Sequence, residues 1–268
     1  MQNIISLISE EINNVNEALN NICDKHNYVY DALQDFINSP SKRIRSVLTI
    51  LYLKSLEKKI SPDIITMLCA GELIHNASLL HDDVLDDANT RRGIQTLHKQ
   101  FSPKIAILCG DYLVSIATKK LAELNNNKIL TIFQECTRKM SDSEIVQFIN
   151  RRKFLDADTY IEICKGKTAA LFVAILESAA TLANIDELAA KNFGENFGIL
   201  FQLKNDTEKY SAQLDKQNNI YTLKDILGIE KTNDLKDNYL ERANTYITNM
   251  PQNIYNNALK DLITKYDG

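Results

Sequence analysis

The chain has 268 residues, of which 44% are hydrophobic and 25% are charged, and its formal net charge is -4. This composition is typical of a soluble globular protein with a sizeable core, and the negative charge gives no reason to expect nucleic acid or an anionic membrane as a partner. Only 8 Gly and 4 Pro interrupt long periodic runs, which predicts an all-α fold. No stretch of about 18 apolar residues occurs, so no membrane span is expected.

The five cysteines are scattered, and none forms a C-x-x-C pair: Cys23, Cys69, Cys109, Cys136 and Cys164. Their odd number and their apolar or helical surroundings indicate reduced, mostly buried thiols. The first segment of the chain is amphipathic and acidic, unlike a secretory signal. We therefore expect a cytoplasmic location.

Apolar residues at helical spacing predict two helices near the amino terminus, over 2–20 and 28–37. Three basic side chains follow at the start of the next helix: Lys42, Arg43 and Arg45. Donors at a helix amino terminus suit an anion such as phosphate. An ordinary basic surface turn is the alternative, and taken alone this segment favours the turn.

A long helix is predicted over 61–89, opened by Ser61 as N-cap and Pro62 in the first turn. Near its end lie four carboxylates: Asp82, Asp83, Asp86 and Asp87. Their spacing places Asp82 and Asp86 on one face of the helix. Such carboxylates repel each other unless a hard cation such as Mg²⁺, typically with substrate phosphates, lies between them.

Arg91 and Arg92 follow this acidic cluster, and guanidinium groups match phosphate oxygens well. The pattern therefore indicates a metal-bridged diphosphate site, with a solvated acidic helix end followed by a basic turn as the alternative. Before the carboxylates the same helix face carries Gly71, His75 and Ser78. This small and polar face could border an open groove, or it could allow close packing of a neighbouring helix.

Ser102 and Pro103 open a further predicted helix, and two more are predicted within 122–153. The next two are predicted over 159–183, capped by Asp156 or Asp158, and over 186–204. A polar loop over 211–221 is followed by two short helices separated at Met250 and Pro251. Lys167 and Thr168 lie beside a glycine inside an apolar helix. Burying a lysine without a partner is costly, so Lys167 is expected either to meet an anion or to extend to solvent.

In combination these segments resemble the all-trans polyprenyl (isoprenyl) diphosphate synthases, and among them the long-chain, octaprenyl-type enzymes. Residues 75–86 with Arg91, Arg92 and Gly93 are similar to the family's first aspartate-rich motif, which is highly specific. Further matches occur in the right order at 109–113, 167–169, 201–202 and 227–231. The resemblance covers nearly the whole chain. It implies one domain over 1–268, a bundle of about ten or more helices around a deep, central apolar cavity.

The resemblance implies a trans-prenyltransferase that condenses isopentenyl diphosphate with an allylic diphosphate, using about two to three Mg²⁺ ions. It assigns metal binding to Asp82, Asp83, Asp86, Asn205 and Asp206. It assigns the allylic diphosphate to Arg91, Lys167 and Gln202, and catalytic support to Lys167, Thr168 and Gln202. It assigns the isopentenyl diphosphate head group to Lys42, Arg45, His75 and Arg92.

One departure from the family pattern concerns its second motif, Asp-Asp-x-x-Asp. The same frame begins here at Asn205 and Asp206 and ends at Lys209, so two of three carboxylates are replaced. Glu208 lies about 200° round the helix from Asp206 and is not a simple substitute. Ile220 stands where the family usually has a lysine. We therefore expect the first motif to carry more of the metal binding than usual.

The resemblance also bears on product length and assembly. Family members with short products carry a bulky residue four or five positions before the first aspartate, whereas this chain has Ser78 and Ala77 there. Small residues favour long products, of the quinone side-chain kind. A homodimer formed through helices like 103–120 is expected.

Two alternatives remain from the sequence. The altered second motif would suit a weakly active or regulatory, diphosphate-binding subunit of a heteromeric synthase. A class I terpene cyclase would share the helical fold and the first motif. Its second motif resembles Asn/Asp-Asp-x-x-Ser/Thr-x-x-x-Glu, which Asn205 and Asp206 fit but Lys209 and Gln213 do not.

Overall fold

The computed structural model describes residues 2–20, 22–23, 27–207 and 218–265. These residues form two compact units. The N-unit comprises Gln2–Ile50 and Ile60–Leu130, and the C-unit comprises Leu51–Lys59 and Thr131–Gly268. Apart from one two-stranded hairpin, the described elements are helices, so the predicted all-α fold is confirmed.

The N-unit contains α1 (Gln2–Ser6), α2 (Ser9–Leu19), α3 (Tyr28–Asn38), the first part of α4 (Ile44–Ser55), α5 (Pro62–Leu85), β1 (Thr90–Arg91), β2 (Ile94–Gln95), α6 (Leu97–Gln100) and α7 (Pro103–Glu123). Its core forms where α5 packs against α7 and α2. Gly110 of α7 allows a close approach, because a Cβ there would lie 2.2 Å from Nε2 of His81. The long helix that carries the acidic cluster is therefore the structural centre of this unit.

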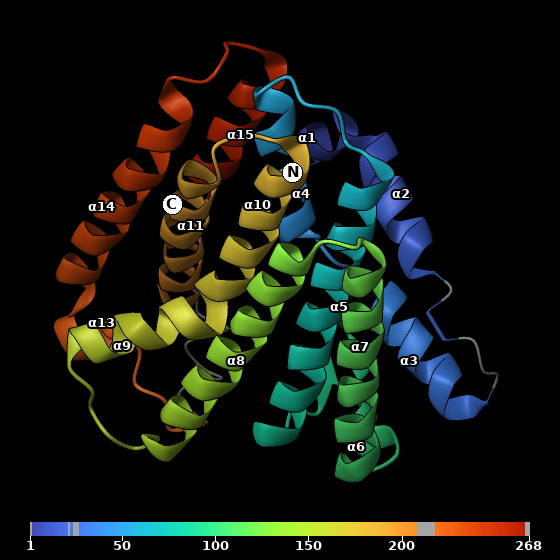
Figure 1. Cartoon of the computed structure of the whole chain (residues 1–268). Helices are drawn as coiled ribbons and strands as arrows, with labels where there is room; N and C mark the ends of the chain where they lie inside the picture. Colours follow the sequence, from blue (N-terminus) through green and yellow to red (C-terminus); the bar gives the residue numbers. More distant parts are fainter. Residues whose placement is uncertain (1, 21, 24–26, 208–217, 266–268) are drawn as a thin grey trace. The chain divides into compact units, whose positions relative to one another are not determined.

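The C-unit contains the end of α4, most of α8 (Asn127–Ile149), α9 (Ala157–Cys164), the π-helical turn η1 (Lys165–Ala169), α10 (Ala170–Ala183), α11 (Glu187–Thr207), α13 (Leu223–Leu227), α14 (Ile229–Thr248) and α15 (Ile254–Thr264). Helices α10 and α11 run side by side, and α14 packs on α11 (Figure 1). A Cβ at Gly198 would lie 2.5 Å from Cα of Ala169. This glycine therefore lets α11 reach the backbone of η1.

Helix starts follow the side chains that the sequence offers as caps. The hydroxyl of Ser61 accepts from the backbone N–H of Ile64, and Ser102 caps α7 in the same way. Asp156 accepts from the N–H of Thr159 at 2.8 Å. These caps satisfy amide groups that have no partner inside the helix. The starts at Ser61 and Ser102 were predicted, and Asp156 was one of the two caps predicted for α9.

Several predicted boundaries were wrong. The helix expected over 2–20 is broken before Ser9, because Ile8 leaves the helical backbone region with φ -131°. Helix α5 ends at Leu85, earlier than expected, because Asp87 takes a left-handed conformation with φ 49° and the N–H of Ala88 bonds to the carbonyl of Asp83. This is the Schellman ending, usually made by glycine.

Differences also occur in the C-unit. A single helix, α8, replaces the two segments expected within 122–153. The predicted helix over 159–183 is present but contains the π-helical turn η1. The part after the predicted loop contains α13 and the long α14 before α15. Of that loop, only its last residues fall in the described range.

One continuous helical stretch of the described residues, Ala157–Ala183, is long and apolar enough to span a membrane by length and composition alone. Its most apolar window is 67% buried within the structure. That burial is the behaviour of a core helix.

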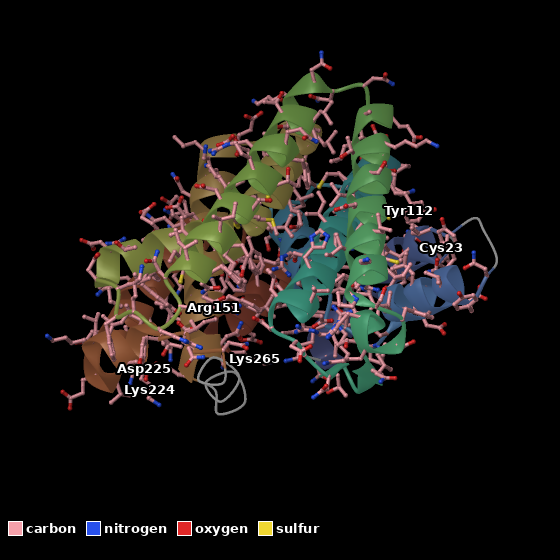
Figure 2. The ribbon with its side chains drawn as sticks, turned by 90° about the horizontal axis from the view of Figure 1, so that it is seen from below. Cys23, Tyr112, Arg151, Lys224, Asp225 and Lys265 are labelled. Atoms are coloured by element: carbon pink, nitrogen blue, oxygen red, sulfur yellow. The ribbon has the colours of Figure 1, made fainter. Side chains whose placement is uncertain are left out.

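The five cysteines are all free thiols, and four of them are buried. Cys23, between α2 and α3, is the half-buried exception (Figure 2). Burial raises the pKa of Cys69 to about 11. The prediction of reduced, mostly buried thiols is confirmed.

Candidate functional site

Asp82 and Asp86 lie on one face at the carboxyl end of α5. Asp86 is the C-cap residue, and its N–H donates to the carbonyl of Asp82 at 2.8 Å, so one helical turn separates the two side chains. Both residues are half-buried. The negative pole of the helix dipole lies at this end of α5 and repels the two carboxylates. A bound cation would relieve both this repulsion and the repulsion between the two charges.

Asp83 faces a different direction from its neighbours. It is 1% exposed, and its Oδ1 accepts from Nε and Nη2 of Arg91 at 2.8 and 2.6 Å. Burial raises the pKa of Asp83, although the charge and hydrogen bonds of Arg91 oppose that rise. Within the described residues, no three or more His, Cys, Asp or Glu side chains are placed to hold a metal ion. Asp83 is therefore directed to Arg91, whereas Asp82 and Asp86 share a helix face.

The β1–β2 hairpin sends the two arginines of the motif in different directions. Arg91 pairs with Ile94 across the hairpin, and the two-residue turn between the strands has φ 53° at Arg92 and φ 82° at Gly93. Two positive φ angles are the signature of the tight type I′ turn. Arginine rarely adopts this conformation, so the turn stores backbone strain directly beside Arg91.

Arg92 is held by neutral groups. Its Nη1 donates to Oγ of Ser39 at 3.1 Å and to Oδ1 of Asn76 at 3.3 Å. Its guanidinium carbon lies 5.8 Å from the centre of the Phe36 ring. Burial and the nearby charge of Arg43 lower the pKa of Arg92. These contacts fix the position of the guanidinium without adding a bonded carboxylate, so its charge remains available to an anion.

Arg43 has a different environment, although it lies in the same basic segment. Its Nη2 donates to the carbonyl of Ile37 at 2.8 Å, and its Nη1 lies 3.5 Å from Oε2 of Glu72, a carboxylate that also accepts from Ser46. Arg43 therefore ties α3, α4 and α5 together. Of the predicted head-group residues nearby, Lys42 is exposed and Arg45 is buried in the first turn of α4.

His75 lies about two turns before Asp82 on α5, near the arginines described above. Its pKa is held well below the ordinary value of 6.5 by burial and by the positive charges of Arg45, Arg92, Arg91 and Arg43. At neutral pH His75 is therefore an uncharged donor and acceptor among cations.

This low pKa predicts a pH dependence of stability. Unfolded His75 binds a proton below about pH 6.5, whereas folded His75 does not, so unfolding becomes easier as the pH falls through that value. For the wild type we expect a loss of at most about 1.4 kcal/mol between pH 7.5 and 5.5 from this residue. His75→Asn should lose less over the same interval. Urea denaturation of both proteins at the two pH values measures the difference, and equal losses would contradict the assignment.

The positions that the resemblance links to product length differ in exposure. Ser78 is half-buried, lies one turn before Asp82 and donates its hydroxyl to the carbonyl of His75 at 2.9 Å. Ala77 is 1% exposed. Only Ser78 therefore lies on the same open face as the acidic pair.

Lys167 lies in η1 of the C-unit and has partners. Its Nζ is 2.5 Å from Oε2 of Glu144 and donates to Oε1 of Gln147 at 2.7 Å, both on α8. The side chain is 30% exposed. Both expected outcomes hold in part, because the lysine meets an anion and also reaches solvent.

Thr168 and Gln202 are joined in one hydrogen-bonded chain. Oγ1 of Thr168 donates to Oε1 of Gln202 at 2.7 Å, and Nε2 of Gln202 donates to Oδ1 of Asp206 at 2.8 Å. Oδ2 of Asp206 accepts from the hydroxyl of Tyr160 at 2.6 Å. The structure thus brings two of the three predicted catalytic residues, Thr168 and Gln202, together.

The second acidic motif is only partly described. Asn205 is half-buried near the end of α11, and Asp206 is 1% exposed. Glu208 and Lys209 lie outside the described residues. Ile220 is described and is half-buried. Both oxygens of the buried Asp206 accept hydrogen bonds from protein groups, and its neighbour Asn205 offers only a neutral oxygen.

Sequence reasoning missed several residues that hold the predicted ones in place: Ser39, Asn76, Glu144 and Tyr160. Ser39 and Asn76 position Arg92, Glu144 pairs with Lys167, and Tyr160 bonds to Asp206. Glu144 and Gln147 could have been linked to Lys167 only by their shared helix face. The other contacts had no signal in the local sequence.

Comparisons with known proteins agree on one family. A model of the family described as polyprenyl synthetase matches residues 26–241. A prenyl transferase of Porphyra purpurea is 31% identical over 74% of this chain and 64% of its own length. An octaprenyl diphosphate synthase of Haemophilus influenzae is 34% identical over 66% of this chain and 54% of its own length. The matches thus span less than two thirds of these relatives.

A solved structure has the same fold. The polyprenyl synthase of Caulobacter crescentus, complexed with calcium and isoprenyl diphosphate, is 23% identical and gives a TM-score of 0.85. The comparison covers 98% of this chain and 96% of that one. The predicted isoprenoid synthase-like fold is confirmed.

Proposed function

Since this chain belongs to the polyprenyl synthetase family, we propose that it condenses isopentenyl diphosphate with an allylic diphosphate to build a long all-trans polyprenyl diphosphate. The carbon–oxygen bond of the allylic diphosphate breaks, and diphosphate leaves with the electron pair. The double bond of isopentenyl diphosphate then forms a carbon–carbon bond to the allylic cation. Loss of a proton to the departing diphosphate restores a double bond.

One observation carries the proposal. The N-unit holds a carboxylate pair at the end of α5 and a basic cluster, which consists of Arg45 and Arg92 near His75 of the same helix. Asp82 and Asp86 would bind Mg²⁺ together with oxygens of the allylic diphosphate, as one or two carboxylates plus phosphates commonly do. The ion would neutralise the charge that develops on the leaving diphosphate. Arg91, held by Asp83, would donate to the same group from its quarter-exposed side chain.

The basic cluster would hold isopentenyl diphosphate. Arg92 is aimed by Ser39 and Asn76, and neutral His75 can donate a hydrogen bond without requiring a further charge. Arg45 and the exposed Lys42 would complete the set. Fixed cationic donors bind phosphate at low cost because they need little reorganisation.

In the C-unit, Lys167, Thr168 and Gln202 would contact the allylic diphosphate and the developing cation. The oxygens of Thr168 and Gln202 are held in one hydrogen-bonded chain. Oriented dipoles of this kind stabilise charge that develops in a transition state. Lys167 would exchange contact with Glu144 for contact with phosphate.

Long products are supported by two observations. Ala77 and Ser78 are small, and one relative is named an octaprenyl diphosphate synthase. The homodimer, the cytoplasmic location and the organisation over 1–268 as one domain remain part of the proposal. Ile107 and Leu108 of α7, the helix expected at the dimer contact, are 43% and 63% exposed.

A second candidate function is favoured by the depleted second motif. With Asn205 and Lys209 in place of carboxylates, the chain could act as a weakly active or regulatory subunit of a heteromeric synthase. The terpene cyclase alternative has less support, because Lys42, Arg45, His75 and Arg92 suit a second diphosphate substrate.

The test is chain elongation by the purified protein. Radiolabelled isopentenyl diphosphate, farnesyl diphosphate as primer and Mg²⁺ should give labelled long-chain products on reversed-phase chromatography, and addition of EDTA should abolish them. No elongation by the protein alone, with elongation restored by a partner chain, would replace the enzyme proposal with the subunit proposal. No label incorporated under either condition would reject both.

A further inference from the structure

We propose that Asp206 is a positioning residue and not a metal ligand, so that the second acidic motif holds no metal ion and metal binding depends on Asp82 and Asp86. This inference rests on the proposed function. The first two positions of the second motif are Asn205 and Asp206, where the family pattern has two aspartates. Asp206 is the carboxylate that remains there, and its role is the one inferred here.

Asp206 is buried, and its carboxylate is hydrogen-bonded within the protein. It is 1% exposed, and each of its oxygens already accepts a hydrogen bond, Oδ1 from Gln202 and Oδ2 from Tyr160. A metal ion would have to displace these donors and bring its charge into a buried site. Mg²⁺ is a poor candidate, because it gives up its water reluctantly and requires near-octahedral oxygen ligands.

The first motif shows the same division of roles between its carboxylates. Asp83 occupies the second position there, as Asp206 does in the second motif. It too is 1% exposed and is bonded to another side chain, Arg91. In each motif the second carboxylate therefore points into the protein. The positions left for metal are the first and the last, Asp82 and Asp86 in the first motif.

In the second motif those two positions are Asn205 and Lys209. Asn205 is half-buried and offers only a neutral oxygen. The carboxylate that survived at Asp206 is the one with a structural partner. The substitutions thus removed both groups that would bind metal and retained the group that binds Gln202.

What Asp206 does is to fix the amide of Gln202. With Nε2 bonded to Asp206, Oε1 of Gln202 must face the hydroxyl of Thr168, which donates to it. Tyr160 holds the other oxygen of Asp206 and so limits rotation of the carboxylate. The network therefore orients a residue that the proposed function places at the allylic substrate.

Metal counting tests the proposal without turnover. Mn²⁺ is titrated into the folded protein with inorganic pyrophosphate and followed by electron paramagnetic resonance. Asp206→Asn is the informative variant, because its side chain keeps an oxygen for Gln202 and a polar partner for Tyr160 but loses the negative charge. We expect the same number of bound Mn²⁺ ions as in the wild type. Asp82→Asn is the positive control and should weaken binding by about tenfold or more.

The reverse variant should add a site. In Asn205→Asp combined with Lys209→Asp, which restores the family pattern, we expect about one further Mn²⁺ ion per chain. A lower count in Asp206→Asn, or an unchanged count in the restored variant, would overturn the proposal. The number of bound Mn²⁺ ions can be measured without catalysis. An inactive wild type would therefore reject the proposed function, and the Mn²⁺ counts would still test the role of Asp206.

Tyr160→Phe tests the positioning role and removes a single hydroxyl. We expect the Michaelis constant for the allylic diphosphate to rise by about tenfold, with the constant for isopentenyl diphosphate and the Mn²⁺ count unchanged. A merely structural effect would reduce the amount of folded enzyme and move neither constant. Equal Michaelis constants in Tyr160→Phe and the wild type would contradict the role assigned to this network.

Discussion

Asp82→Ala is expected to abolish measurable chain elongation, with a loss in kcat of at least about a hundredfold to a thousandfold. The reason is that, among the residues the structure describes, Asp82 and Asp86 at the end of α5 are the acidic pair to which we assign Mg²⁺. Asn205 is neutral and Asp206 is buried, so we expect no replacement from the described part of the second motif. The rate of incorporation of radiolabelled isopentenyl diphosphate measures the effect.

The matched control is Asp87→Ala, on the same acidic segment. The side chain of Asp87 is 80% exposed, and its Oδ1 lies 2.6 Å from Nζ of Lys99. An exposed ion pair of this kind contributes little to stability, and the residue has no proposed role at the metal. We expect activity close to that of the wild type. Near-normal activity in Asp82→Ala, or an equal loss in both variants, would reject the assignment of metal binding to the pair.

The second large effect concerns the length of the product, and Ser78→Tyr is expected to shorten it. Ser78 lies one turn before Asp82 on the half-buried face of α5, so an aromatic ring there would stand in the way of a chain that grows along this face. The product mixture, dephosphorylated and separated by reversed-phase chromatography, should shift to fewer isoprene units.

Two neighbouring variants serve as controls for this prediction. Ser78→Ala keeps a small side chain and should leave the product distribution unchanged. Ala77→Tyr is also expected to shorten the product, but Ala77 is 1% exposed, and overpacking a buried position costs about 1–3 kcal/mol. Ser78→Tyr is therefore the cleaner test. An unchanged distribution in Ser78→Tyr would place the growing chain elsewhere.

Local chemistry explains why much of the fold was predictable. Helix starts at Ser61, Ser102 and Asp156 follow from side chains that cap free amide groups, and the structure has them there. Helix ends were less predictable. The left-handed backbone at Asp87 closes α5 without a glycine, and the π-helical turn around Lys167 has no marker in the periodicity.

In the candidate site, too, some features follow from the local sequence and others depend on tertiary contacts. The sequence by itself determined that Asp82 and Asp86 share a helix face, since this needs only the helical repeat, and that Arg91 and Arg92 follow closely. It could not decide which carboxylates face outward. That depends on contacts between elements distant in the chain, such as the bond between Tyr160 and Asp206, which are 46 residues apart.

Tertiary structure alone therefore assigned different roles to side chains that look alike in the motifs. Asp83 holds Arg91, Asp206 holds Gln202, and Arg92 is held by Ser39, 53 residues earlier. The physical reason is burial. A buried carboxylate must find donors within the fold, and those donors come from whichever elements pack around it, which helical periodicity does not specify.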